Sequence, residues 1–432
     1  MNFFSTRGGI RGHLLSEALR LGAAPDGGLF MPEALPRHDA AGFDPESPLA
    51  TFAAQWLRPL FAEDSLAPEL DRICAEAFTF PVPIVMPDET RPRLHALELF
   101  HGPTGAFKDF GARFLMSCFD RLAGAEPLTV LAATSGDTGG AVGAAAEGRA
   151  SVRAVILFPK GRVSPFQERQ LTCWGDNVVA IEVDGDFDDC QRLAKAAFAD
   201  SALSGRHRLT SANSINLGRL LPQAAYVAHA AVRLAASSGA TPGFIVPSGN
   251  LGHGFATLLA RAMGAPIGPV VLATNANATL GDWSRGQGYE PRPSVATLAN
   301  AMDVGDPSNF ERLLALGVTP DDLVVEQVDD RCIADRIVQD YARSGYVWCP
   351  HSATAAEAFE RLLPSARDER PCLAAATAHP FKFADVVEPL IGRRLEPSPP
   401  LAGIEGRPVR KRAIAPALHA LRELLDAGPF PA

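Results

Sequence analysis

The sequence lacks paired cysteines, a signal-peptide core and any long uninterrupted hydrophobic run. Its seven cysteines are scattered, odd in number and never spaced as Cys-x-x-Cys, a pattern typical of reduced, buried thiols rather than a disulfide framework. The first residues, MNFFSTRGGIRGH, contain no hydrophobic signal core. Glycine, proline and asparagine interrupt the longest uncharged windows, such as Ala262 to Gly281, so these would make poor membrane spans. We therefore expect a soluble cytoplasmic protein.

Positive charge is also scarce. The 40 lysines and arginines are outnumbered by 49 aspartates and glutamates, which gives a formal net charge of −9. No long basic run is present, so nucleic-acid binding is not expected. The acidic run Asp184 to Asp189 begins like a calcium loop, but Asp189 stands where such a loop needs glycine. Neither H-E-x-x-H nor G-x-S-x-G occurs, and we expect no metal.

Apolar segments alternate with helical ones through most of the chain. At 432 residues and 47% hydrophobic content, the chain suits two or three packed domains. Short apolar runs predict buried strands at 128–133, 152–158, 178–183, 269–274 and 373–377. Their alternation with helices indicates parallel sheets covered on both faces, whose ligands bind beyond the carboxyl ends of the strands. The first eighty or so residues are predicted to be helical and loop-rich, with one helical stretch over Pro45 to Arg72.

One lysine, Lys108, stands in an unusual setting, the segment HGPTGAFKDFG from His101 to Gly111. Its glycines and proline predict a turn, and Thr104 and Asp109 can cap or charge the start of a helix. Neighbouring phenylalanines would desolvate the lysine and so favour the neutral amine, the nucleophilic form that builds a Schiff base. A snorkelling surface lysine is the commoner alternative for any single lysine.

Two glycine-rich loops follow predicted strands. PSGNLGHG, from Pro247 to Gly254, combines flexible glycines with a helix start and can form a phosphate cup, although a tight turn without a ligand is equally compatible. TSGDTGG, from Thr134 to Gly140, offers hydroxyls and helix-start amides that suit a carboxylate. An ordinary helix N-cap would produce the same pattern in this second loop.

Two further polar segments complete the set. SANSINLGRL, from Ser211 to Leu220, contains Arg219, which is suited to gripping a phosphate, or is an exposed arginine after a capped helix start. In TAHPFKF, Thr377 offers a hydroxyl to a ring nitrogen, or is a capping threonine. Pyridoxal phosphate explains a buried lysine, a phosphate cup and a neutral hydroxyl together, because it forms an imine with lysine and has both a phosphate and a ring nitrogen.

These segments resemble one family, the threonine synthases among the fold-type II pyridoxal-phosphate enzymes. The resemblance is carried by HGPTGAFKDFG, TSGDTG, SPFQERQL, DGDFDDCQ, SANSINLGRLLPQ, PSGNLG, LANAMDVGDPSNFER and TAHPFKF, in that order. It implies an α/β fold with two parallel-type sheets flanked by helices and a mainly helical N-terminal domain. We expect that domain at 1–85, a large cofactor-binding domain at 86–125 and 225–432, and a small domain at 126–224.

The same resemblance assigns roles to individual residues. Lys108 would hold the cofactor as a Schiff base, and Thr377 would face its pyridine nitrogen. The cofactor phosphate would lie against Gly249, Asn250, Leu251 and Gly252. The bound amino acid would lie against Ser135, Asp137 and Thr138, and its phosphate against Ser214 and Arg219. Asp303 would line the site without an assigned role.

Three positions depart from the family's usual pattern. Gly105 stands where a larger apolar residue is common, His253 where this branch more often has a carboxylate, and Phe381 where a small residue is common. Because Lys108 and the glycines of the cup are present, the expected chemistry is unaffected. His253 would instead change the surroundings of the substrate phosphate.

The activity implied is conversion of O-phospho-L-homoserine and water to L-threonine and phosphate, by β,γ-replacement with Lys108 as the base. Two alternatives remain open: a phospholyase of the same family that releases 2-oxobutyrate, and a non-catalytic descendant that binds a phosphorylated amino acid. We expect a monomer or a weak homodimer with a small-molecule substrate.

Overall fold

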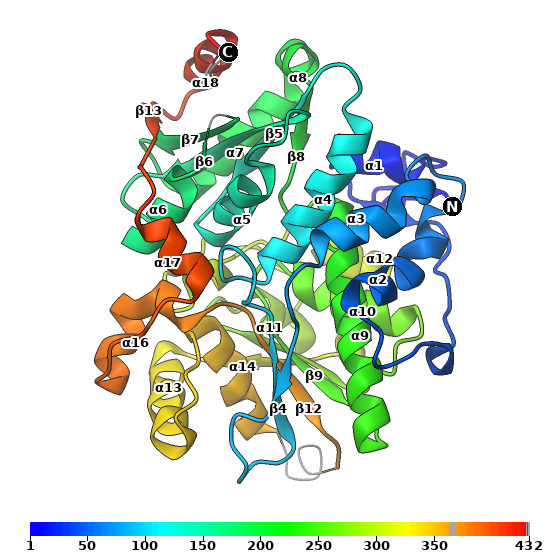
Figure 1. Ribbon diagram of the computed structural model, residues 1–432, viewed down its shortest axis with the longest axis vertical. Coiled ribbons are helices and arrows are strands. Elements are labelled where there is room, and N and C mark those ends of the chain that lie inside the picture. Colours follow the sequence, from blue (N-terminus) through cyan, green and yellow to red (C-terminus); the bar gives the residue numbers. More distant parts are fainter. Residues whose placement is uncertain (176, 363–368, 429, 431–432) are drawn as a thin grey trace.

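The computed structural model describes residues 1–175, 177–362, 369–428 and 430, which form two parallel sheets lying one above the other in Figure 1. The larger sheet has the order β11-β10-β9-β12-β4-β3, in which only the pairing of β3 with β4 is antiparallel. Its strands are β3 (Ile84–Val85), β4 (Leu94–Glu98), β9 (Gly243–Pro247), β10 (Val270–Thr274), β11 (Val324–Gln327) and β12 (Cys372–Ala376).

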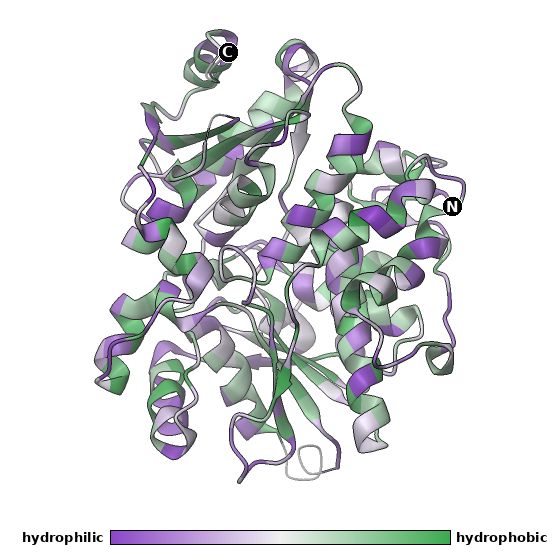
Figure 2. Cartoon of the chain, in the orientation of Figure 1, coloured by the Kyte–Doolittle hydropathy of each residue, from purple (hydrophilic) through white to green (hydrophobic). Residues whose placement is uncertain are grey.

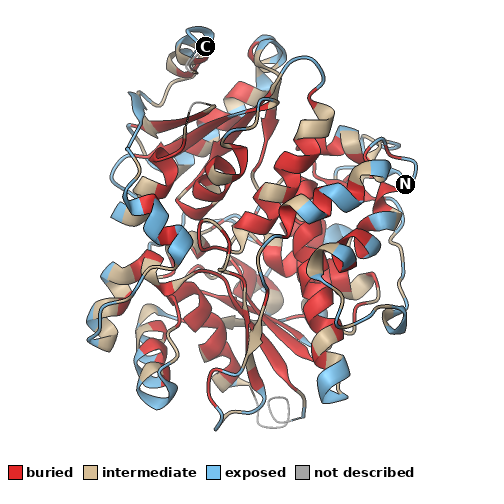
Figure 3. Cartoon of the chain, in the orientation of Figure 1, coloured by how far each residue is buried: buried red, intermediate tan, exposed pale blue. Residues whose placement is uncertain are grey.

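The smaller sheet is entirely parallel, with the order β13-β7-β6-β5-β8. Its strands are β5 (Leu128–Ala133), β6 (Val152–Pro159), β7 (Val178–Val183), β8 (Leu209–Ser211) and β13 (Arg412–Ile414). The apolar runs predicted as strands all form strands, and two of them, β5 and β7, have the predicted bounds. The central strands are hydrophobic and buried along their length, as the green and red arrows of Figures 2 and 3 show.

Helices cover both sheets. Around the smaller sheet lie α5 (Asp137–Ala146), α6 (Pro165–Thr172), α7 (Phe187–Ala199), α8 (Ser201–His207) and α18 (Leu418–Asp426). The helices α4 (Lys108–Leu122), α9 (Leu221–Ser238) and α10 (Gly252–Ala262) share one large apolar core with the N-terminal region. The others along the larger sheet and the connection back are α11 (Thr279–Ser284), α12 (Phe310–Ala315), α13 (Asp330–Ser344), α14 (Pro350–Arg361), α16 (Ala384–Ile391) and α17 (Pro399–Glu405). Among the described residues, no helix has the length and apolar character needed to cross a membrane.

The N-terminal region contains a two-stranded antiparallel sheet, β1 (Phe3–Ser5) with β2 (Phe30–Pro32), and the helices α1 (Leu15–Leu21), α2 (Leu49–Leu57) and α3 (Leu70–Ala77). The single helical stretch predicted from residue 45 to 72 is wrong. Two short 3-10 helices separate α2 from α3, and each has a proline in its first turn. Proline has no N–H to donate and fixes its own backbone angle, so it starts a new turn instead of continuing the old one.

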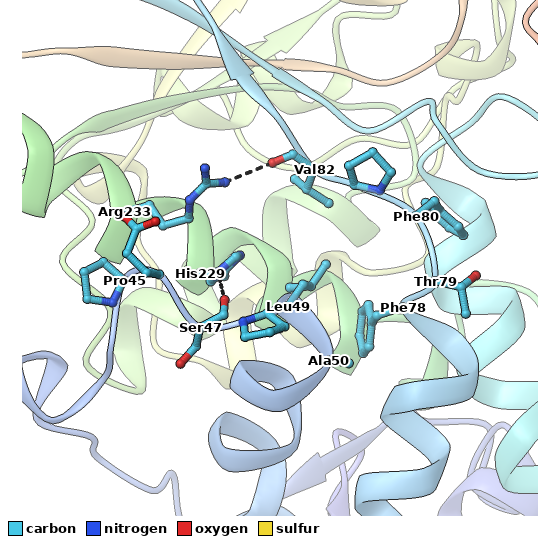
Figure 4. Close-up of a pocket in the computed structure, with 13 residues that line it drawn as sticks. Pro45, Ser47, Leu49, Ala50, Phe78, Thr79, Phe80, Val82, His229 and Arg233 are labelled. Atoms are coloured by element: carbon cyan, nitrogen blue, oxygen red, sulfur yellow. Dashed lines mark hydrogen bonds between the residues drawn. The ribbon is translucent and has the colours of Figure 1, made fainter.

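The N-terminal region is fastened to α9 around a surface cavity of about 350 Å³. Figure 4 shows two contacts there: His229 Nε2 lies 3.0 Å from the Ser47 carbonyl, and Arg233 donates to the Val82 carbonyl at 3.2 Å. None of the residues predicted for the functional site lines this cavity. It belongs to the packing of the N-terminal region on α9.

The C-terminal segment returns to the smaller sheet, where Figure 1 shows β13 and α18 in red. The predicted division of the chain put these residues in the large domain, but β13 pairs with β7, and Leu421 and Leu425 of α18 join the apolar cluster of the smaller sheet. This strand was not predicted, because it has only three residues and lies in a basic stretch. Next to it, Lys411 binds Glu168 and Glu182 at 2.7 and 2.6 Å.

The attachment of α18 can be tested by substituting Leu421, which is fully buried. We expect Leu421→Ala to lower the free energy of unfolding by about 2–5 kcal/mol, because it removes buried methyl groups and leaves a cavity. The measurement is urea unfolding followed by circular dichroism. The exposed neighbour Glu423 provides the control, since Glu423→Ala should change stability by less than about 0.5 kcal/mol. Equal effects of the two substitutions would show that α18 is not docked.

Candidate active site

Lys108 is the first residue of α4, and the end of β12 determines where it lies. The backbone N–H of Phe107 donates to the Thr377 carbonyl at 2.9 Å, which ties the residue before the lysine to the end of the strand. Asp109 accepts hydrogen bonds from the backbone N–H and the hydroxyl of Thr104, at 2.9 and 2.7 Å. These bonds close the turn before α4. Asp109 charges the first turn, as predicted, but neither residue caps the helix, whose N-cap is Phe107.

Lys108 keeps some access to solvent but lies deep enough in the protein for its charge to be disfavoured. Burial lowers its pKa to about 8; the anionic Asp137 opposes this shift, and Lys382 and Arg219 add to it. A substantial fraction of the amine is therefore neutral near pH 7.5, as a nucleophile requires. The structure excludes the snorkelling surface lysine that was the alternative.

A second lysine, Lys382, lies beside the first and was missed in the sequence. Its side chain is fully buried, with Nζ 2.9 Å from Asp137 Oδ1 and donating to the Thr104 carbonyl at 2.8 Å. Burial acts to raise the pKa of Asp137, but the charges of Lys382 and Lys108 outweigh it and hold that pKa well below its usual range. Asp137 is therefore an anion facing two lysines. The sequence shows a lysine between two phenylalanines in TAHPFKF, but this pattern does not indicate Asp137 as its partner.

The predicted phosphate cup lies between β9 and α10. Leu251 precedes α10 with φ of 61°, a left-handed conformation that is strained for a residue with a side chain. A Cβ on Gly249 would lie 2.7 Å from the Met302 Cα, so only glycine allows that segment to approach. The helix that follows starts at Gly252 and presents the unpaired N–H groups of its first turn. The residues present thus fit a phosphate.

Ser214 is brought directly to this cup. Its hydroxyl accepts from the side-chain amides of Asn250 and Asn309, at 2.9 and 3.1 Å. Arg312 fixes the arrangement by donating to the carbonyls of Ser214 and Ile215, at 3.0 and 2.7 Å. Three segments that were separate in the sequence therefore meet at one place. Arg312 was not predicted, because an arginine that holds backbone carbonyls has no local sequence signature.

Arg219 is buried, with 3% of its surface exposed, which rules out the exposed arginine considered as its alternative. One guanidinium nitrogen donates to the Ala212 carbonyl, and Nε is buried without a hydrogen-bond partner among the described residues. Burial lowers the pKa of Arg219 to about 10, so the group remains charged at neutral pH. A buried cation with an unused N–H is suited to binding an anion.

Thr377 and the loop after β5 are held by backbone contacts. Thr377 N donates to the Ser352 hydroxyl at 2.9 Å, and the short helix that follows is capped by His379, so Thr377 is not its capping residue. In the other loop, the Thr134 hydroxyl accepts from the N–H groups of Gly136 and Gly139. Ser135 and Thr138 are half-buried there, at the start of α5. Their contact with a bound amino acid remains a prediction.

Two of the three residues that depart from the family's pattern, His253 and Gly105, have local explanations. His253 is buried, stacks on Phe107 with ring centroids 4.9 Å apart, and lies 3.1 Å from the Tyr226 hydroxyl. Burial lowers its pKa to about 3, so it is neutral. Gly105 has φ of 63°, and a Cβ there would lie 3.1 Å from Leu401 of α17. Leu401 thus fills space beside the glycine.

Asp303 anchors the loop that backs the phosphate cup. Its carboxylate accepts from the backbone N–H and the hydroxyl of Thr297, at 3.0 and 2.7 Å, and from Asn275 at 2.8 Å. These bonds hold the adjacent Met302 against Gly249. Burial raises the pKa of Asp303 to about 6. The sequence placed this residue near the site but gave it no role.

Family models and curated relatives match this chain. The family described as "Pyridoxal-phosphate dependent enzyme" matches residues 82–378, "Threonine synthase N terminus" matches 2–78, and "Threonine synthase, C-terminal" matches 352–425. The threonine synthase of Serratia marcescens is 36% identical over 96% of both chains. That of Haemophilus influenzae is 37% identical over 91% of this chain and 92% of its own.

Solved structures agree. The crystal structure of threonine synthase from Escherichia coli has a TM-score of 0.92 and 35% identity, covering 99% of this chain and all of that one. The structure of PLP-bound threonine synthase from Brucella melitensis has a TM-score of 0.90 and 33% identity, covering 99% of each chain.

The fold defines a fold-type II pyridoxal-phosphate-dependent enzyme, and the chain has both a desolvated amine and a helix start that fits a phosphate at the carboxyl edge of a mainly parallel sheet. Threonine synthase models match both ends of the chain, and curated threonine synthases align with it along almost its whole length. The chain belongs to the threonine synthase family.

The influence of Lys382 on Lys108 can be measured. We expect Lys382→Met to raise the pKa of Lys108, because it removes a neighbouring cation and leaves Asp137 to pair with Lys108 alone. The pH midpoint for combination of the cofactor-free protein with pyridoxal phosphate should then move up from about 8. Stopped-flow absorbance between pH 6 and 10 would follow it. The control is Lys160→Met at an exposed lysine, and an unmoved or lowered midpoint in Lys382→Met would contradict the coupling.

Proposed function

We propose that the enzyme converts O-phospho-L-homoserine and water to L-threonine and inorganic phosphate. The observation that carries the proposal is the presence of two anion-binding segments beside one reactive lysine. The cup at residues 249–252 suits the cofactor phosphate, and the loop with Ser214 and Arg219 suits a second phosphate. Ser214 is hydrogen-bonded to Asn250 of the cup, so the two segments are adjacent. A substrate that carries its own phosphate accounts for both.

Lys108 supplies the proton transfers. When bound, pyridoxal phosphate provides the electron sink that stabilises negative charge on the substrate carbons. Lys108 Nζ, whose pKa is near 8, would accept the proton from the α-carbon, release it to solvent, and then as a neutral amine accept the proton from the β-carbon. The C–O bond to the γ-phosphate breaks, water adds its hydroxyl to the β-carbon, and protons return to the α- and γ-carbons. The sum is threonine plus phosphate.

The other residues bind and orient. Arg219 and Ser214 would hold the leaving phosphate, whose charge grows as its bond to carbon breaks, so their contribution is larger in the transition state than in the bound substrate. Ser135 and Thr138 would lie against the substrate carboxylate, at the start of α5. Lys382 and Asp137 hold fixed charges beside Lys108 and so set its protonation.

The reaction itself is tested by incubating the holoenzyme with O-phospho-L-homoserine and measuring threonine, 2-oxobutyrate and phosphate in one sample. We expect threonine and phosphate in equal amounts. Phosphate accompanied by 2-oxobutyrate would instead indicate a phospholyase, and the absence of turnover a binding protein. Lys108→Ala should abolish turnover yet retain cofactor through the cup, measured by equilibrium dialysis.

Arg219→Ala should lower kcat by roughly two to three orders of magnitude, the range for loss of one group that stabilises charge in a transition state. Steady-state phosphate release measures it. Arg233→Ala, on α9 beside the cavity of Figure 4, removes a comparable side chain away from the predicted site residues and should leave kcat within about threefold. If Arg219→Ala also stayed within that range, the arginine would not contact the substrate phosphate.

A further inference from the structure

A histidine outside all the predicted motifs is held in a defined orientation beside Lys108. His351 is in the first turn of α14, and 4% of its surface is exposed. Its Nε2 accepts a hydrogen bond from the backbone N–H of Ala301 at 3.0 Å. A backbone N–H can only donate, so Nε2 carries a lone pair. In the neutral ring the proton must therefore be on Nδ1.

That Nδ1–H group is buried and has no hydrogen-bond partner among the described residues. A buried donor without a partner destabilises the protein, and native proteins seldom leave one unpaired. Protonation of the whole ring would not relieve the cost, because burial lowers the pKa of His351 to about 4 and the ring is neutral. An acceptor supplied by a ligand would relieve it.

The surroundings of His351 indicate which ligand. The charged groups that act on its ring are the reactive amine of Lys108 itself and two of the groups that act on that amine, Asp137 and Lys382. On one side, Ala301 precedes Met302, which backs the phosphate cup at Gly249.

On the other side, the adjacent Ser352 accepts from the backbone N–H of Thr377, the residue expected at the pyridine nitrogen. The ring of Phe383 packs against His351, with centroids 4.8 Å apart, and fixes its plane. The histidine is therefore held between the segment that backs the phosphate cup and the strand end that carries Thr377.

We propose that His351 is a further cofactor-binding residue, whose Nδ1–H donates a hydrogen bond to an acceptor atom of bound pyridoxal phosphate. The assignment rests on the cofactor and not on the identity of the substrate. With the cofactor bound, the buried Nδ1–H would have a hydrogen-bond partner. The hydrogen bond from Ala301 to Nε2 keeps the proton on Nδ1 and so selects the tautomer that can donate to the cofactor.

The two nitrogens can be tested separately. The amide oxygen of glutamine can take the place of Nε2, so His351→Gln can keep the bond to Ala301 and lose the Nδ1 donor. The amide of asparagine reaches only the place of Nδ1, so His351→Asn can keep a donor and lose the bond to Ala301. The measurements are the Kd of pyridoxal phosphate by absorbance titration, the Tm of the cofactor-free proteins, and KM.

We expect the Kd of His351→Gln to rise about tenfold or more, the equivalent of one hydrogen bond to a charged acceptor, with little change in the Tm of the cofactor-free protein. His351→Asn should show a Kd at least about threefold lower than that of His351→Gln, and a lower Tm. Should His351→Gln also melt early, the two Kd values are compared at a temperature at which both variants are folded, and their ratio decides.

His229→Gln is the matched control. His229 also has a buried Nδ1 without a partner among the described residues, but its Nε2 faces the Ser47 carbonyl, so its Nε2 donates and its Nδ1 is an acceptor. Its substitution should leave the Kd of the cofactor unchanged. Equal Kd values for the two His351 variants would overturn the proposal. So would an unchanged Kd with a raised KM, which would move the contact to the substrate. Failure of the reaction assay in the wild-type enzyme would leave the cofactor titration intact, so the two proposals can fail independently.

Discussion

A single buried carboxylate, Asp137, faces the two lysines Lys108 and Lys382, and this uneven balance of charge governs the site. One anion cannot satisfy two cations equally in a poorly solvated space. Lys382 has the direct contact, together with a carbonyl to bind, and remains an ordinary buried ion pair. Lys108 does not have that direct contact, and burial lowers its pKa. The low pKa of the reactive amine thus comes first from burial, which Asp137 opposes and to which Lys382 and Arg219 add.

The same interaction joins the two sheets. Asp137 begins α5 on the smaller sheet, whereas Lys382 follows β12 of the larger one. Breaking a buried ion pair by removing one partner is strongly unfavourable, because the other charge remains without compensation. The ion pair therefore fixes the start of α5, where the substrate is expected to bind, relative to the end of β12, which positions Lys108. The position of the sheets and the acidity of the amine are linked through the same three side chains.

How much the sequence predicts depends on whether a feature is local. Some features depend on short segments whose residue types alone indicate their chemistry: Lys108, the cup at Gly249, and the pair Thr104 and Asp109. The buried strands are also local, because each is a continuous apolar run. Lys382, Arg312 and His351 act through partners far away in the chain, Asp137, Ser214 and Ala301, and no local pattern records such contacts. The short strand β13 is equally hidden, because its place depends on the free edge of β7 and on ion pairs made by Lys411.

The pairing of β13 with β7 has a consequence for synthesis of the chain on the ribosome. Strands β9, β10, β11 and β12 of the larger sheet all lie between these two partners in the chain. A nascent chain will therefore display the unpaired edge of β7 throughout the emergence of most of the larger sheet. Such an edge is a template for pairing with other chains. Glu182 of β7, which binds Lys411 in the finished protein, provides a charge on that edge until its partner arrives.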